Sequence, residues 1–472
     1  MLPEPDVCER ARLSRDARFD GRFFVGVITT GIYCRPVCPA RLPARENVRV
    51  FPSAAAAQDA GFRPCLRCRP ENAARLPEWC ISSRSVLRGL RLIDSGFLDR
   101  VQATQLARRL GMSQRHMNRL FSQELGATPK SLAQTRRRQL AKRLIDDSDA
   151  PLAQIALQAG YGSVRRFNDD MLKVYGRSPR ALRASGRGGR PAASGSLQFR
   201  LPFRLPYDAQ WIFAFLRRRA LPGLEEVGTG NYRRRITDRR GQHHWINVTA
   251  EEEALVLSVP ADPAIDLADV IARVRRVFDL DADSSVVDAH LATDPRLAEV
   301  VGDCPGLRVP GAWDGFETAV RAVLGQQVSV DRATSLGRRL MQTYGDGGFP
   351  SAAALSRATP AEIGMPGLRG QAISSLAAMV AQGDLTLDDG ADVDVLKDRL
   401  CDIRGIGPWT AAYVAMRIAK DPDAFPHGDW VVLKVLGTTA GEARRISSAW
   451  QPWRSYAVMY LWKLSERFSA AA

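Results

Sequence analysis

Four cysteines constrain the first part of this chain more than any other feature of its sequence. They form two close pairs, Cys34-x3-Cys38 and Cys65-x2-Cys68, separated by a long loop. Two such pairs suit a tetrahedral zinc site with four thiolate ligands, and the glycine and prolines around them place both pairs on turns. We therefore predict a small α/β domain over residues 1–80 that holds one zinc ion. A zinc knot without chemistry of its own is the alternative.

The residues around these cysteines form a longer pattern. GIYCRPVCPAR is followed by RENVRVF and GFRPCLRCRP, and together they resemble the N-terminal domain of the Ada alkylation-response proteins. The resemblance implies that Cys34 accepts a methyl group from a DNA methyl-phosphotriester, and that Cys38, Cys65 and Cys68 are the other zinc ligands. Forming a thioether removes one negative charge from the site, which predicts tighter binding to DNA phosphates after methylation.

Positive charge is concentrated in one segment. Residues 84–190 hold 22 Lys/Arg and eight Asp/Glu, a net charge of +14 out of +16 for the whole chain. Such a segment is typical of an element that meets nucleic-acid phosphates. A solvated face or a basic linker is the simpler alternative.

The basic segment contains an internal repeat. Thr104–Phe121 and Pro151–Phe167 each have the pattern of two amphipathic helices broken by a glycine, Gly111 or Gly160. With GYGSVRRFNDDMLKVYGRSPRALR, they resemble the all-α AraC-family DNA-binding domain over residues 84–184. Each second helix would enter a major groove of operator DNA. Position on these helices gives the candidate contacts: Gln114, Arg115, Asn118, Arg119, Ser163, Arg165, Arg166 and Asn168.

The remainder of the chain divides into strands followed by helices. Residues 185–196 are rich in Gly, Ser, Pro and Ala and are typical of a linker. Strand-like runs follow at Leu197–Phe203, His243–Thr249 and Ala254–Pro260, with a helical run at Asp208–Arg219. We predict an antiparallel sheet subdomain over 197–292 and an all-α domain over 293–472, within a multidomain α+β chain.

The C-terminal helices contain a hairpin motif. In LCDIRGIGPWT, Gly405 and Gly407 lie between two helical runs, which indicates a helix-hairpin-helix whose backbone N–H groups approach a DNA phosphate. The hairpin alone predicts only sequence-independent DNA contact. Asp429 follows it in AFPHGDWVVLK, and a single acid after such a hairpin is the signature of base-excision glycosylases. A helix N-cap without chemistry is the alternative for Asp429.

A wider match resembles the AlkA-type 3-methyladenine DNA glycosylases. It includes YDAQWIFAFLRRRALPGLE, GAWDGFETAVRAVLGQQVSV and WQPWRSYAVMYLW. The resemblance implies that Asp429 is the catalytic carboxylate and that a flipped base lies among Trp409, Tyr413 and Trp462. It also implies a wedge at Gln326–Gln327, where the family usually has an apolar residue. Because Gln327 is polar, which residue fills the gap in the duplex stays open.

Chemistry favours an alkylated purine as the substrate. The base must leave the stack to be reached, and its positive charge suits electron-rich aromatic faces. Trp409 stands where bifunctional relatives carry a Schiff-base lysine, which predicts hydrolysis without strand cleavage. No four-cysteine cluster follows Asp429, so we expect no iron–sulfur cluster.

These patterns together predict a repair protein that excises alkylated bases and, once methylated at Cys34, activates transcription, with RNA polymerase as a partner. Its other partner is double-stranded DNA, both alkylated and operator. We expect a cytoplasmic monomer without a membrane partner, because no apolar stretch reaches the roughly 20 residues of a membrane span. Two alternatives are an activator whose C-terminal half binds DNA without catalysis, and a repair enzyme that is only tethered by the basic segment. The linker predicts weak coupling between Cys34 methylation and base excision.

Overall fold

The computed structural model describes residues 2–148, 150–185, 195–360, 363, 367–388 and 390–470. The chain forms two compact units. The first comprises Met1–Arg204, Asp238–Gln242 and Glu251–Ala272, and the second Leu205–Thr237, His243–Ala250 and Arg273–Ala472. No helix in the described part of the chain has the length and apolar character to cross a membrane.

The first unit begins with helix α1 (Pro5–Ser14) and a small four-stranded sheet. Its strands, in the order β3-β1-β2-β4, are β3 (Val48–Phe51), β1 (Phe24–Val27), β2 (Ile32–Cys34) and β4 (Arg63–Pro64). Helix α2 (Ala54–Asp59) begins where Ser53 Oγ accepts the N–H of Ala56 at 3.0 Å. Its alanines pack with Phe24, Tyr33 and Phe51, so one small apolar core holds the cysteine-bearing turns in place.

The described residues of the basic segment form eight helices. They are α3 (Arg84–Asp94), α4 (Phe97–Arg100), α5 (Ala103–Arg109), α6 (Gln114–Leu125), α7 (Pro129–Asp147), α8 (Leu152–Gln158), α9 (Val164–Tyr175) and α10 (Pro179–Ser185). Two helix-turn-helix units, α5–α6 and α8–α9, repeat the same local chemistry. Ser113 Oγ accepts from the N–H of His116, and Ser163 Oγ accepts from the N–H of Arg166, each at 3.3 Å. The internal repeat expected from the sequence is therefore a structural repeat.

Two strands that follow this segment also belong to the first unit. Strand β5 (Ser196–Pro202) pairs antiparallel with β9 (Ala254–Pro260). Residues 186–194 of the predicted linker lie outside the described residues. The runs Leu197–Phe203 and Ala254–Pro260, which the sequence predicts as strands, correspond to β5 and β9.

Side chains of the helical segment explain this grouping. The guanidinium of Arg100 donates from Nη1 to Oδ2 of Asp266 at 2.8 Å. The Gln154 amide donates to the carbonyl of Ala261 at 3.1 Å, and that of Gln158 donates to the carbonyl of Asp262 at 3.3 Å. The segment after β9 is thus held by α4 and α8 through polar contacts that no hydrophobic pattern reveals.

The second unit combines antiparallel strands with a large helical part. Its strands are β6 (Glu225–Val227), β7 (Asn231–Thr237) and β8 (His243–Ala250), paired in that order. The helices that concern the site are α11 (Ala209–Arg219), α14 (Pro295–Asp303), α15 (Gly315–Leu324), α16 (Val330–Tyr344), α18 (Leu368–Gln382), α19 (Val393–Cys401), α20 (Pro408–Arg417), α21 (Trp430–Leu436) and α23 (Arg454–Ala470). The remaining elements include α12 (Leu267–Val277), α13 (Ser284–Leu291), α17 (Ala352–Leu355) and α22 (Ala440–Ile446).

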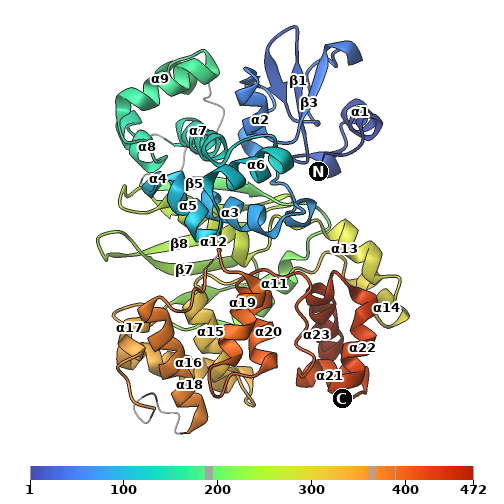
Figure 1. Ribbon diagram of the computed structural model, residues 1–472, viewed down its shortest axis with the longest axis vertical. Helices are drawn as coiled ribbons and strands as arrows, with labels where there is room; N and C mark the ends of the chain where they lie inside the picture. The colour runs from blue at the N-terminus through green and yellow to red at the C-terminus, as the bar shows by residue number, and fades with distance from the viewer. Residues whose placement is uncertain are drawn as a thin grey trace. The chain divides into compact units, whose positions relative to one another are not determined.

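One apolar core holds the hairpin-bearing helices together. Val320 and Val323 of α15, Leu376 of α18, Leu400 of α19 and Val414 of α20 are fully buried in it. Helices α21, α22 and α23 lie together after them in the chain, as Figure 1 shows. The multidomain α+β fold predicted from the sequence is confirmed by these elements.

Candidate functional site

The four predicted zinc ligands meet beside the small sheet. Cys34 ends β2, and the parallel pairing of β2 with β4 brings Cys65 next to it, with the N–H of Cys65 donating to the carbonyl of Tyr33 at 3.0 Å. The four Sγ atoms lie within 4.8 Å of one another. Thiolates at about 2.3 Å from a tetrahedral zinc are about 3.8 Å apart. The four residues therefore fit one zinc ion.

The cysteines differ in exposure and surroundings. Cys34 is partly exposed, whereas Cys38, Cys65 and Cys68 are buried. The backbone N–H of Arg35 donates to Cys68 Sγ at 3.4 Å, and its guanidinium donates to the Cys68 carbonyl at 3.2 Å. Asp20 orients that guanidinium through an Nε–Oδ1 hydrogen bond of 2.8 Å. The N–H of Arg35 favours a thiolate at Cys68. Its partial exposure makes Cys34 the most accessible of the four cysteines.

The candidate DNA contacts of the two helix-turn-helix units lie on the surface. Seven of the eight predicted side chains are exposed, and Asn118 is partly buried. Arg115 and Arg165 are each the second residue of their helix, α6 and α9. The Ser163 oxygen caps α9 by accepting the N–H of Arg166, which leaves its hydroxyl hydrogen to donate to DNA. The two arginines thus stand at equivalent, accessible positions.

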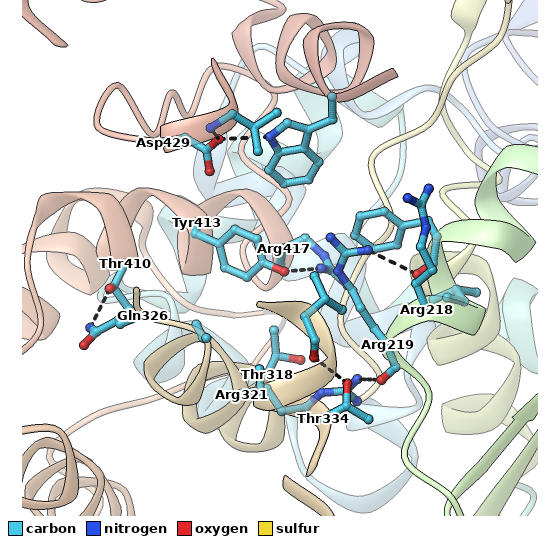
Figure 2. A pocket seen from close by; sticks show the side chains of 18 of the residues that line it. Arg218, Arg219, Thr318, Arg321, Gln326, Thr334, Thr410, Tyr413, Arg417 and Asp429 are labelled. Carbon is cyan, nitrogen blue, oxygen red and sulfur yellow. Dashed lines mark hydrogen bonds between the residues drawn. The ribbon is translucent and has the colours of Figure 1, made fainter. Parts of the chain in front are cut away.

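The second unit encloses a pocket of about 1050 Å³. Its walls come from α11, α15, the 325–330 loop, the 405–407 hairpin, the first turns of α20 and α21, and α23. Figure 2 shows side chains that line it. All the residues predicted for catalysis and base binding line it, namely Trp409, Tyr413, Asp429 and Trp462. Elements far apart in sequence therefore converge on one cavity.

Asp429 is a buried carboxylate held by four donors. It caps α21, with Oδ1 accepting the N–H groups of Val431 and Val432, each at 3.1 Å. The indole of Trp409 donates to Oδ2 at 3.0 Å, and that of Trp462 donates to Oδ1 at 3.2 Å. Asp429 is thus an N-cap, which is one part of the alternative given for it. Its carboxylate also lines the pocket in a fixed orientation.

Aromatic rings form the pocket walls next to this carboxylate. Trp409 stacks on Tyr413 with ring centroids 5.6 Å apart, and Tyr413 lies 6.4 Å from Trp462. Phe215 of α11 stacks on the other side of Trp462 at 6.1 Å. Such faces attract a cationic aromatic ligand.

The hairpin and the neighbouring glutamines lie at the edge of the pocket. Gly405 has φ +97°, and a Cβ there would lie 2.9 Å from the Leu368 carbonyl oxygen. Gln326 points inward, because its amide donates to the Gly405 carbonyl at 3.0 Å and to Thr410 Oγ1 at 2.9 Å. Gln327 is exposed and has φ +54°. The two adjacent glutamines therefore differ completely in their surroundings.

Sequence reasoning missed many residues of the pocket, among them Phe215, Arg219 and Arg417. Phe215 and Arg219 lie one helical turn apart on α11, and Arg417 lies one turn after Tyr413 on α20. The Arg417 guanidinium donates to the Tyr413 hydroxyl at 2.6 Å, as Figure 2 shows. The i, i+4 spacing in FLRRR and YVAMR was the available signal, but it does not say which face borders a cavity.

Comparisons with known proteins match each part of the chain. Residues 198–314 match the family model of the AlkA N-terminal domain, residues 7–71 that of the metal binding domain of Ada, and residues 106–185 that of a helix-turn-helix domain. The chain is 34% identical to DNA-3-methyladenine glycosylase 2 of Escherichia coli over 56% of this chain and 96% of that protein. It is 32% identical to the bifunctional transcriptional activator/DNA repair enzyme AdaA of Bacillus subtilis over 37% of this chain and 80% of that protein.

One relative matches almost from end to end. The probable bifunctional transcriptional activator/DNA repair enzyme AlkA of Mycobacterium tuberculosis is 41% identical, and the match covers 99% of this chain and 97% of the relative. It spans the cysteine cluster, both helix-turn-helix units and the aromatic pocket together. The chain therefore belongs to the family of bifunctional transcriptional activator/DNA repair enzymes in which an Ada-type front half is joined to an AlkA-type glycosylase half.

Proposed function

We propose that the second unit is a monofunctional DNA glycosylase that hydrolyses the N-glycosidic bond of alkylated purines such as 3-methyladenine. One observation carries the proposal: the Asp429 carboxylate is held rigidly by two backbone and two indole N–H groups at the wall of an aromatic pocket. The similarity to a DNA-3-methyladenine glycosylase supports it.

The pocket residues divide the chemistry between them. The rings of Trp409, Tyr413 and Trp462 receive a flipped cationic base. Asp429 stabilises the positive charge that develops at the anomeric carbon and orients the attacking water. The bond from that carbon to the base nitrogen breaks with its electron pair on the base, while a bond to the water oxygen forms. Position 409 carries no amine, so no Schiff base forms and the strand stays intact.

The first unit is proposed to sense DNA methylation. A single bound zinc would keep Cys34, Cys38, Cys65 and Cys68 as thiolates. Cys34 then takes the methyl group of a phosphotriester, its S–C bond forming as the methyl–oxygen bond breaks and a phosphodiester is left. We propose that the methylated, monomeric protein binds its operator through α6 and α9 and recruits RNA polymerase in the cytoplasm.

Base release from methylated duplex DNA tests the glycosylase directly. Wild type is compared with Asp429→Asn, which keeps an N-cap but removes the charge. We expect wild type alone to release 3-methyladenine without strand cleavage. Absence of release by both proteins, with DNA binding retained, would instead support an activator whose C-terminal half only binds DNA.

Mass spectrometry tests the methyl acceptor. After incubation with DNA that carries methyl-phosphotriesters, we expect one methyl group per chain, located on Cys34. A methyl group on Cys38, Cys65 or Cys68 would contradict the assignment. The same DNA without phosphotriesters is the control.

A further inference from the structure

Two arginines of the pocket have no acid as an ion-pair partner in the described part of the chain. Among the residues that the structure describes, no carboxylate lies within hydrogen-bonding or ion-pairing distance of the guanidinium of Arg219 or Arg417. Both guanidiniums lie against the same ring, with their carbons 3.8 Å and 5.1 Å from the centroid of Phe215. A pocket for a cationic base would not be expected to contain such a pair.

The other arginines of the pocket are neutralised. Arg234 Nη1 lies 2.9 Å from Glu225, and Arg321 Nη1 lies 2.8 Å from Glu317. These four residues form one buried, charge-balanced cluster. Arg218 is paired with Glu466. The excess charge therefore belongs to Arg219 and Arg417 alone.

Of these two, Arg219 has more donors to spare, and Arg417 is buried whereas Arg219 is partly exposed. The three guanidinium nitrogens of Arg417 donate to the carbonyls of Pro310 and Gly311 and to the Tyr413 hydroxyl. Arg219 makes one hydrogen bond, from Nη1 to the carbonyl of Phe215 at 3.3 Å. A guanidinium has five N–H donors, so most of those on Arg219 are available to a ligand.

The electrostatic effect of this pair is visible in neighbouring groups. Burial lowers the pKa of Arg219 to about 10; the Tyr413 phenol opposes this shift, and the nearby guanidiniums add to it. Burial raises the pKa of the Tyr413 phenol, yet the surrounding positive charge outweighs burial and lowers that pKa below its ordinary value. The guanidiniums responsible are those of Arg417, Arg219 and Arg321.

The positive pair lies at the opposite end of the aromatic wall from the carboxylate. Asp429 bonds to Trp409 and Trp462, which contact Tyr413, and Tyr413 in turn contacts Arg417. Figure 2 shows Tyr413 between Asp429 and the two arginines in this view. The pocket therefore has a negative end and a positive end.

We propose that Arg219 stabilises the negative charge on a departing base and so sets the balance between neutral lesions and cationic ones. This inference rests on the proposed glycosylase function. A neutral base with a ring carbonyl leaves as an anion, because the electron pair of the broken bond stays on it. A hydrogen bond from Arg219 to that anion stabilises it. A cationic base leaves as a neutral molecule and gains nothing from the guanidinium.

Single-turnover excision on two duplexes tests the proposal. One carries 7-methylguanine, which is cationic, and the other hypoxanthine, which is neutral and has a carbonyl. For Arg219→Gln we expect hypoxanthine excision to fall by about tenfold or more, while 7-methylguanine excision is unchanged or faster. Arg219→Lys keeps the charge and should stay near wild type in the ratio of the two rates. Arg217→Gln, on the same helix but exposed outside the pocket, is the matched control.

Each other outcome overturns the proposal. Equal losses on both duplexes would show that Arg219 has only a structural role. Release of 7-methylguanine without hypoxanthine by wild type would show that neutral bases are not substrates. Release of neither base would mean that the glycosylase proposal itself has failed. Thermal unfolding identifies a misfolded variant, in which case Arg219→Met, whose apolar stem can still cover Phe215, takes the place of Arg219→Gln.

Discussion

The indole N–H of Trp409 donates a 3.0 Å hydrogen bond to Oδ2 of Asp429. The same indole stacks on Tyr413, with an angle of 18° between the rings. Trp409 therefore joins the wall proposed to receive the base to the carboxylate proposed to act at the sugar. Because one rigid side chain serves both, the position of the base and the position of the charge are fixed together.

Trp409→Phe should separate these two roles. It removes the N–H donor to Asp429 but keeps an aromatic face for the base. We expect the single-turnover rate of 3-methyladenine excision to fall by about tenfold, because one charged hydrogen bond is lost, with little change in affinity for DNA. Trp245→Phe, on β8 and outside the pocket, is the control. A rate equal to wild type would show that the indole N–H does not position Asp429.

Alanine substitutions at the two hairpin glycines should change different properties, stability for Gly405 and DNA binding for Gly407. Gly405→Ala places a Cβ 2.9 Å from the Leu368 carbonyl oxygen at φ +97°, so we expect a loss of about 1–3 kcal/mol in unfolding free energy. Gly407→Ala meets no atom within 4 Å and should leave thermal unfolding unchanged. Its methyl group should nevertheless weaken DNA binding, measured by anisotropy, because it blocks close approach of a phosphate. Unchanged binding by Gly407→Ala would contradict a phosphate contact there.

Zinc content tests the cysteine cluster. Elemental analysis of the purified chain should give one zinc ion, and Cys65→Ser should lower this strongly because a closed four-thiolate site loses a ligand. The exposed Cys401 lies outside the cluster, so Cys401→Ser should retain the metal. Full zinc content in Cys65→Ser would remove the cluster as the metal site.

The two helix-turn-helix units should contribute alike. Arg115→Ala and Arg165→Ala change equivalent exposed positions of α6 and α9. If each arginine contacts a phosphate, each variant should bind the same duplex more weakly, and the slope of log K against log salt should fall by about 1. Arg200→Ala, an exposed arginine of β5 paired with Glu251, controls for net charge. A defect in only one of the two variants would show that the units are not equivalent on DNA.

The sequence predicted side-chain positions best where the spacing of a motif limits its possible geometry. The spacing of Cys34, Cys38, Cys65 and Cys68 implies one metal site, and their sulfurs do lie together. The acid and three aromatics taken from the glycosylase resemblance also reach one pocket. The side chains of each set are proposed to act on one ligand, zinc for the cysteines and a flipped base for the acid and the aromatic residues.

Other features depended on tertiary contacts that a pattern does not contain. Arg219 and Arg417 look like solvent-facing helix residues until α11 and α20 are packed around one cavity. The grouping of β5 and β9 with the first unit follows from bonds such as Arg100–Asp266. The expectation that Cys34 methylation couples weakly to base excision stays a prediction.

Substitutions of the adjacent Gln326 and Gln327 should have contrasting effects on stability and excision. Gln326→Ala leaves the Gly405 carbonyl and Thr410 Oγ1 without their amide donor, so we expect a lower thermal unfolding temperature and a secondary loss of activity. Gln327 is exposed at the pocket edge with φ +54°, so Gln327→Gly should fold at least as well, since glycine adopts that conformation freely. If Gln327 fills the gap left by the flipped base, Gln327→Gly should slow excision from duplex DNA far more than from single-stranded DNA, where no gap forms. Equal slowing on both substrates would exclude Gln327 as the wedge.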